Sequence, residues 1–216
     1  MASETLTTRD PTTGRLAESR QRAGDESIAA KIGDPGPLGL AAFALTTFVL
    51  SSVNSGLLPV SVEGVVFGLA LFYGGIVQVF AGLWEFAKGN TFGATAFCSY
   101  GAFWMSLWYL LVHVDLSGAG ADAKTGVGVF LLGWTIFTVY MTVAAFRTTS
   151  ALFGVFVLLS LTFVCLAAAD LGAGAGLGTI GGWLGLLTAL GAWYCSFAAV
   201  VNATWKRVVL PVGPRV

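Results

Sequence analysis

Six long apolar stretches constrain the fold of this chain more than any other feature. They cover about residues 38–58, 61–86, 92–114, 126–146, 150–169 and 178–203. A helix that crosses the hydrocarbon core of a bilayer needs roughly 20 apolar residues, with a range of about 17–25. Backbone amides in lipid must be hydrogen-bonded within their own segment, which favours helices. The sequence therefore predicts an all-α integral membrane protein with six transmembrane helices.

Composition supports the same class and narrows the partners. Of the 216 residues 56% are hydrophobic and only 10% are charged, against roughly 25% charged residues in an average soluble domain. The formal net charge is zero, so no basic surface favours nucleic acid. The three cysteines are well separated within apolar runs, which is typical of buried thiols rather than of disulfides or a metal site. We expect a lipid bilayer as partner, and no nucleic acid, metal or cofactor.

The distribution of charge predicts the organisation and orientation of the chain. Residues 1–33 hold nearly half of the charged residues and no long apolar run. We expect a polar, disordered tail there, then a six-helix transport domain over 34–208 and a C-terminal tail over 209–216. With six spans, ten of the eleven Lys and Arg residues lie on the side of both termini, and only Lys124 lies opposite. The positive-inside rule then predicts a multi-pass protein of the plasma (inner) membrane with both termini in the cytoplasm.

A motif of prolines and glycines directly precedes the first apolar stretch. Proline lacks a backbone N–H and is tolerated in the first turn of a helix, where N–H groups have no partner within the helix. We expect Asp34 as the N-cap and Pro35 as the first helical residue, with the Asp34 carboxylate accepting a hydrogen bond from the Gly36 N–H. The motif therefore predicts a rigid start for the first span, made of Asp34, Pro35, Gly36, Pro37, Leu38 and Gly39.

Few ionisable groups lie within the predicted spans. Glu85 lies three residues before Lys88, a spacing that allows an interfacial ion pair, and a role in proton coupling is the alternative. No Lys or Arg lies at the centre of a span. The amides of Asn54 and Gln78 need several partners in lipid and should face the interior of the bundle. This set of groups predicts a narrow pathway for a small polar solute or a weak acid.

Two stretches carry a resemblance to a known family. They are "FYGGIVQVFAGLWEFAKGNTFGATAFCSYGAFW", residues 72–104, and "DPGPLGLAAFALTTFVLSSVNSGL", which begins at Asp34. Together they closely resemble the acetate uptake transporter family, from about residue 34 to "VLPVG" at 209–213. The resemblance implies a six-helix protomer around a narrow pore, assembled as a homohexamer. It implies transport of acetate, related small monocarboxylates and, in some members, succinate, and it leaves channel and proton-symport mechanisms open.

The resemblance also implies site residues. The hydrophobic constriction of the family, a Phe, a Tyr and a Leu, falls on Phe43, on Tyr100 of "SYG" and on Leu161 of "SLT". The chain departs from the family's hallmark Asn-Pro-Ala-Pro-Leu-Gly-Leu with Asp34 and Gly36, which leaves the substrate range open. Matches to the family and polar groups in the spans together give the substrate-binding candidates Thr46, Thr47, Asn54, Gln78, Ser99 and Ala192.

The expected function is therefore that of a membrane transporter or channel for acetate and related small carboxylates. No nucleophile–base pair, phosphate-binding loop or cluster of metal ligands in the sequence argues for an enzyme. The alternative is a channel for a small neutral solute, such as ammonia, urea or an undissociated acid.

Overall fold

The computed structural model describes residues 32–215, and this part of the chain is almost entirely helical. Within it six helices are long and apolar enough to cross a membrane: Gly36–Asn54, Val65–Ala87, Thr91–His113, Ala121–Ala145, Ser150–Ala173 and Gly176–Trp205. The predicted all-α architecture with six membrane-spanning helices is therefore confirmed. Apart from Ile32 and Gly33, the tail expected over residues 1–33 lies outside the described residues.

Two of the six spans change helix type along their length. The elements, in order, are α3 (Gly36–Asn54), the 3₁₀ turn η1 (Val60–Val62), α4 (Val65–Gly68), the π-helix η2 (Leu69–Val77), α5 (Gln78–Ala87), α6 (Thr91–His113), the 3₁₀ turn η3 (Ser117–Ala119), α7 (Ala121–Ala145), α8 (Ser150–Ala168), the π-helix η4 (Ala169–Ala173) and α9 (Gly176–Trp205). The second span thus combines α4, η2 and α5, and the fifth combines α8 and η4. Single π-helical turns are frequent at functional sites, and η2 ends directly before Gln78.

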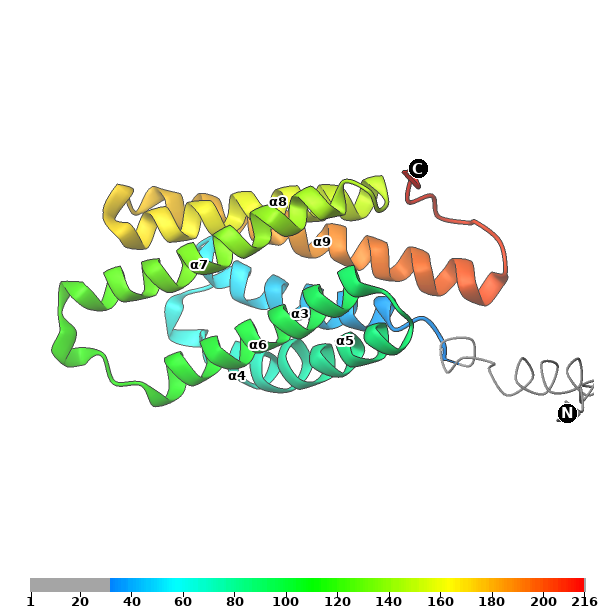
Figure 1. The fold of residues 1–216 in the computed structure, drawn as a ribbon. Helices are drawn as coiled ribbons and strands as arrows, with labels where there is room; N and C mark the ends of the chain where they lie inside the picture. The colour runs from blue at the N-terminus through cyan, green and yellow to red at the C-terminus, as the bar shows by residue number, and fades with distance from the viewer. Residues whose placement is uncertain (1–31, 216) are drawn as a thin grey trace, which may run out of the picture.

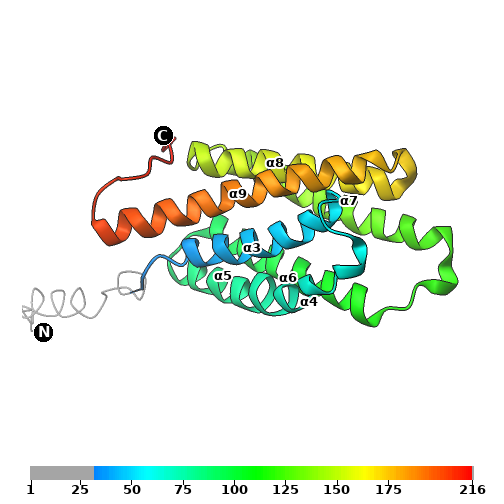
Figure 2. The same cartoon turned by 180° about the vertical axis from the view of Figure 1, so that it is seen from behind.

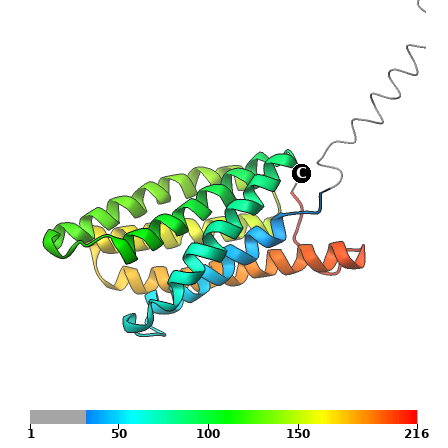
Figure 3. The same ribbon diagram turned by 90° about the horizontal axis from the view of Figure 1, so that it is seen from below.

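The spanning helices close into a ring (Figures 1 and 3). Helix α3 packs against α9, α9 against α8, and α8 against α7. Helix α7 contacts α6, which packs against η2 and α5, and these return to α3. Figure 2 shows α3 and α9 side by side from behind. Side chains directed into the ring are therefore surrounded by helices.

The first and last described residues lie at the same end of the ring (Figure 1). We call this the terminal end; it also holds the turn between α5 and α6 and the turn between α7 and α8. The opposite, distal end holds η1, η3 and η4.

Two glycines allow α9 to approach α3 closely. A Cβ atom on Gly182 would lie 2.6 Å from the Cα of Ser55 and closer still to its backbone N. A Cβ atom on Gly185 would overlap the hydroxyl of Ser51. Small residues are the usual way in which helices pack backbone to backbone in membranes. The seam between the first and last spans therefore depends on the absence of a side chain at these positions.

The start of α3 differs by one residue from the expectation. The first helical hydrogen bonds run from the N–H groups of Leu38 and Gly39 to the carbonyl of Pro35, at 3.1 and 3.2 Å. Pro35 is therefore the N-cap, and the helix begins at Gly36. Asp34 lies one residue outside the cap, where its Oδ1 accepts from the N–H of Gly36 at 2.9 Å. The carboxylate still occupies the free N–H end of the helix, where negative charge is favourable.

The C-terminal residues pack back onto the terminal end of the ring. The side chain of Asn202 in α9 donates to the carbonyl of Leu210 at 2.9 Å and accepts from the N–H of Val209 at 2.7 Å. The N–H of Ser150, at the start of α8, donates to the carbonyl of Gly213 at 2.7 Å. These bonds tie the end of α9 to the start of α8 and bring Val212 to the rim of a cavity.

Candidate functional site

Two cavities lie inside the ring, one towards each end. The terminal cavity, of about 280 Å³, is lined by residues of α3, α5, α6, α8 and α9 and by Val212. The distal cavity, of about 260 Å³, is lined by Asn54, Glu63 and Asp170 and otherwise by mainly apolar side chains. No residue lines both cavities. The two cavities are therefore separate.

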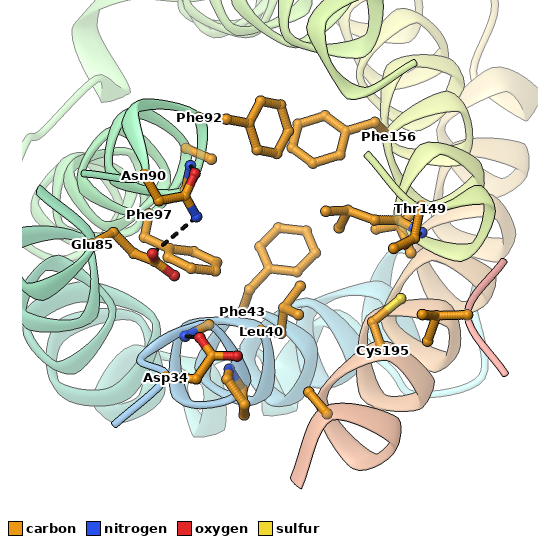
Figure 4. A pocket seen from close by; sticks show the side chains of 18 of the residues that line it. Asp34, Leu40, Phe43, Glu85, Asn90, Phe92, Phe97, Thr149, Phe156 and Cys195 are labelled. Carbon is orange, nitrogen blue, oxygen red and sulfur yellow. Dashed lines mark hydrogen bonds between the residues drawn. The ribbon is translucent and has the colours of Figure 1, made fainter. Parts of the chain in front are cut away.

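The mouth of the terminal cavity carries two carboxylates and an amide (Figure 4). Glu85 of α5 is almost fully buried, and its Oε2 accepts from the Nδ2 of Asn90 at 2.9 Å. The Oδ1 of Asn90 accepts from the N–H of Gly93 at 3.1 Å, so the same amide caps α6. A Cβ atom on Gly36 would lie 3.1 Å from Asp34 Oδ1 and 3.3 Å from Glu85 Oε1. Both carboxylates therefore flank one point at the rim.

Lys88, the expected ion-pair partner of Glu85, lies close enough to interact with its charge and has a further contact. The ammonium of Lys88 donates to the carbonyl of Ile32 at 3.1 Å. Glu85 has its hydrogen bond with Asn90, five residues later and beyond the turn. Asn90 is not among the site residues predicted from the sequence, although its position directly before α6 is typical of an N-cap residue.

Gln78 is the most deeply buried polar residue on the wall of the terminal cavity. Its side chain is fully buried, and neither Nε2 nor Oε1 has a hydrogen-bond partner among residues 32–215. A buried polar group without a partner costs about 1–3 kcal/mol. Gln78 lies seven residues before Glu85 on α5, or about 10 Å further along the helix axis from the mouth. Gln78 thus lines the cavity with an amide donor and an amide acceptor that have no partner among the described residues.

An aromatic layer separates the two cavities. The ring centroids of Phe43 and Tyr100, which both line the terminal cavity, are 5.8 Å apart. Those of Phe103 and Phe163, which both line the distal cavity, are 5.3 Å apart. The Tyr100 hydroxyl donates to the Oγ1 of Thr138 at 3.0 Å, which holds the ring in place. Dry apolar layers of this kind can gate a pore by excluding water.

The structure places the expected constriction residue on α8 away from both cavities. Leu161 is 46% exposed and does not line either cavity. Leu159, at 4% exposure, lines the terminal cavity with Phe43 and Tyr100. Residues separated by two positions in an α-helix are rotated by about 200° about the helix axis, so the side chains of Leu159 and Leu161 face opposite ways. The spacing of apolar residues that line the cavity from α8 gives the inward face as Leu152, Val155, Phe156 and Leu159.

The substrate-binding candidates are not brought to one place. Gln78 lines the terminal cavity and Asn54 the distal cavity. Thr47 is buried, and its hydroxyl has no hydrogen-bond partner among the described residues. Like Thr47, the remaining three candidates line neither cavity: Thr46, Ser99 and Ala192.

Local packing explains where Thr46 and Ala192 lie. The hydroxyl of Thr46 donates to the carbonyl of Ala42 at 2.9 Å, as hydroxyls in membrane helices commonly do. A Cβ on Gly74 would overlap Thr46, so this side chain fills the seam between α3 and η2. Ala192 is fully buried between helices, whereas Cys195, one turn later on α9, does line the terminal cavity.

The distal cavity contains an acidic group whose titration can be tested. Burial raises the pKa of Glu63 above its ordinary value of 4.5. A raised pKa in the folded state gives stability that is present below pH 4.5 and is lost as the pH rises through the folded pKa. We therefore expect Glu63→Gln to raise the melting temperature in detergent at pH 7 and to have no effect at pH 4.

Asp115 provides a control of opposite sign. Its Oδ1 accepts from the N–H of Ser117 at 2.9 Å, and this bond lowers the pKa of Asp115. Asp115→Asn should therefore give no gain in melting temperature at pH 7. A Glu63→Gln protein that is stabilised equally at pH 4 and pH 7 would contradict the assignment.

Comparisons with known proteins identify several similar chains. Residues 20–214 match the sequence model of the GPR1/FUN34/yaaH family. Over 183 residues the chain is 38% identical to the "Succinate-acetate/proton symporter SatP" of Escherichia coli K12, covering 85% of this chain and 96% of that protein. Over 190 residues it is 41% identical to "Ammonia transport outward protein 2" of Saccharomyces cerevisiae, covering 85% of this chain and 66% of that protein.

A solved structure is also similar. The structure described as the bacterial acetate channel SatP matches with a TM-score of 0.77 and 36% sequence identity, over 84% of this chain and 99% of that chain. The yeast relatives are longer, and this chain spans 62–66% of their length.

Proposed function

Because this chain belongs to the GPR1/FUN34/yaaH family, we propose that it is a membrane transporter or channel for acetate and related small carboxylates, including succinate. The observation that carries the proposal is the pair of cavities inside one ring of helices, facing opposite ends and separated by one aromatic layer. Similar proteins are named a symporter and a channel, which supports transport rather than enzymatic chemistry.

The proposed pathway runs from the terminal cavity through the aromatic layer to the distal cavity. Its neck is formed by Phe43, Tyr100 and Leu159, with the free amide of Gln78 on one side and Asn54 on the other. None of the described residues that line either cavity is a Lys or an Arg. Binding should therefore be weak, in the millimolar range or about −4 kcal/mol, which favours flux over retention.

The proposed setting is a homohexamer in the plasma (inner) membrane, with the terminal end in the cytoplasm. The hexamer rests on the family resemblance. The orientation is supported by the positions of Lys88, Arg147 and Lys206, which follow α5, α7 and α9 at the terminal end, because basic residues favour the cytoplasmic side. We further propose that residues 34–208 are the transport domain, flanked by two tails.

Acetate uptake by the purified full chain in proteoliposomes tests the function. Labelled acetate should enter faster than in protein-free liposomes, and unlabelled succinate should compete. Repeating the measurement with and without an imposed pH gradient separates proton-linked transport from passive conduction. Equal uptake in both types of vesicle would contradict the proposal.

A channel for small neutral solutes is a second candidate. It is favoured by the two carboxylates at the mouth of the terminal cavity, Asp34 and Glu85, and by the similarity to a protein named for ammonia transport. Ammonia or urea flux that acetate does not inhibit would favour this candidate over carboxylate transport.

A pair of leucines on α8 tests the proposed neck. Leu159→Ala should widen it and raise succinate uptake relative to acetate uptake by about tenfold, because steric discrimination in apolar pockets is of this size. Leu161→Ala removes the same atoms from the opposite face of the same helix and should leave the ratio unchanged. A ratio that rises in Leu161→Ala and stays unchanged in Leu159→Ala would place Leu161, and not Leu159, in the neck.

A further inference from the structure

The inner part of the terminal cavity offers an unusual pair of free groups. Gln78 is fully buried there, and its Nε2 donor and Oε1 acceptor both lack a partner among residues 32–215. The two atoms lie side by side in the plane of one carboxamide. Buried polar groups in native proteins are nearly always satisfied, so these atoms point to a ligand with the complementary pattern.

An undissociated carboxylic acid has that complementary pattern. Its carbonyl oxygen accepts and its adjacent hydroxyl donates, so it can form two parallel hydrogen bonds with one carboxamide. A carboxylate has acceptors only. It would bond Nε2 but leave Oε1 of Gln78 facing an anionic oxygen. The amide therefore distinguishes the two protonation states of the same small acid.

The charges along the cavity favour the same protonation state. Asp34 and Glu85 flank the mouth, Lys88 lies close enough to Glu85 to interact with its charge, and no described residue that lines the cavity is a Lys or an Arg. An anion would pass two carboxylates, which is unfavourable at short range, and would then enter a wall made largely of Phe and Leu side chains without a compensating charge. An uncharged acid meets neither penalty.

We infer that the terminal cavity takes its substrate as the uncharged carboxylic acid and that the carboxamide of Gln78 recognises it through two hydrogen bonds. The inference rests on the proposed function and specifies the chemical form of the substrate. Glu85 and Asp34 then act as a filter that disfavours the anion at the mouth.

Acetamide is the probe that isolates this property. It has the size of acetic acid, it is uncharged at every pH used, and it presents a donor and an acceptor side by side. The full chain is reconstituted in liposomes, and uptake of labelled acetate and labelled acetamide is measured from pH 6 to pH 8, with uptake by protein-free liposomes subtracted. Acetamide uptake should not change with pH.

Acetate uptake is measured in two series on the unaltered chain. At constant total acetate, uptake should fall about tenfold for each pH unit, because a simple carboxylic acid is mostly ionised above about pH 5. When total acetate is raised to hold the uncharged acid constant, uptake should stay constant. Acetate uptake that is unchanged with pH at constant total acetate, or that follows an imposed membrane potential, would show that the anion is carried and overturn the inference.

Gln78→Met tests the recognising group, because methionine has a similar shape without the donor or the acceptor. We expect acetate and acetamide uptake to fall together by about tenfold. The matched control is Phe80→Leu on the same helix, whose side chain is 56% exposed on the outer face, and it should change neither. Full uptake of both solutes by Gln78→Met would remove Gln78 from the site.

Failure of the proposed function is a distinguishable result. In that case neither solute would enter faster than in protein-free liposomes. Equilibrium dialysis of acetamide against the detergent-solubilised protein then tests the inferred binding site independently of transport. Binding that Gln78→Met abolishes would support the site without transport, and no binding would overturn it.

Discussion

Gly182→Ala is expected to destabilise the protein by about 3 kcal/mol or more, at the upper end of what overpacking produces. The added Cβ would lie 2.6 Å from the Cα of Ser55 and closer to its N. Backbone atoms cannot rotate away as a side chain can, so α9 must move off α3. The measurement is the melting temperature and the monodisperse fraction of the purified protein in detergent.

Gly178→Ala is the matched control for this change. It adds the same methyl group to the same helix, where the nearest atom would be the Cβ of Ala169 at an ordinary 3.7 Å. Alanine is a better helix former than glycine by about 1 kcal/mol, so this variant should be neutral or slightly more stable. Equal melting temperatures for the two variants would show that the close approach of α3 and α9 contributes little.

Phe43→Ala is expected to have the largest effect on selectivity. Its ring belongs to the layer between the two cavities and contacts the ring of Tyr100. Removing it should join the cavities and raise the uptake of succinate relative to acetate by more than about tenfold, since more than one methylene of steric exclusion is lost. The ratio of the two rates in proteoliposomes is the measurement, because it does not depend on how much protein is folded.

Phe48→Ala controls for the loss of an aromatic ring from α3. Phe48 packs against Trp193 of α9 with ring centroids 5.2 Å apart and lines neither cavity. This variant should lose stability without a change in the ratio. A similar rise in the succinate-to-acetate uptake ratio in both variants would mean that loosening of the bundle, rather than opening of the neck, admits succinate.

The spans could be predicted because their cause is local. Each contains enough consecutive apolar residues to cross a bilayer, and each must satisfy its own backbone hydrogen bonds. The ends of the helices are harder to predict from the sequence. Whether Asp34 or Pro35 caps α3 depends on which carbonyl the next N–H groups reach, and in the structure it is the carbonyl of Pro35. Helix ends commonly shift by a residue for this reason.

The residues of the candidate site were only partly predictable. Phe43 and Tyr100 lie together at the end of the terminal cavity. Leu161 lies outside both cavities and Leu159 lines the terminal one, because a matched motif carries a residue type but not its rotation about the helix axis. Asn90 was missed because its bond to Glu85 crosses a turn between two spans.

The six membrane-crossing helices follow from the sequence alone, since apolar length and backbone hydrogen bonding are properties of each segment. Which side chains share a cavity depends on how the helices pack against one another. Gln78 shows the reason: an amide in an apolar span predicts that partners exist, but whether neighbouring helices supply them depends on how six helices pack. Here the neighbouring helices leave both amide atoms of Gln78 without a hydrogen-bond partner, and Gln78 lines the terminal cavity.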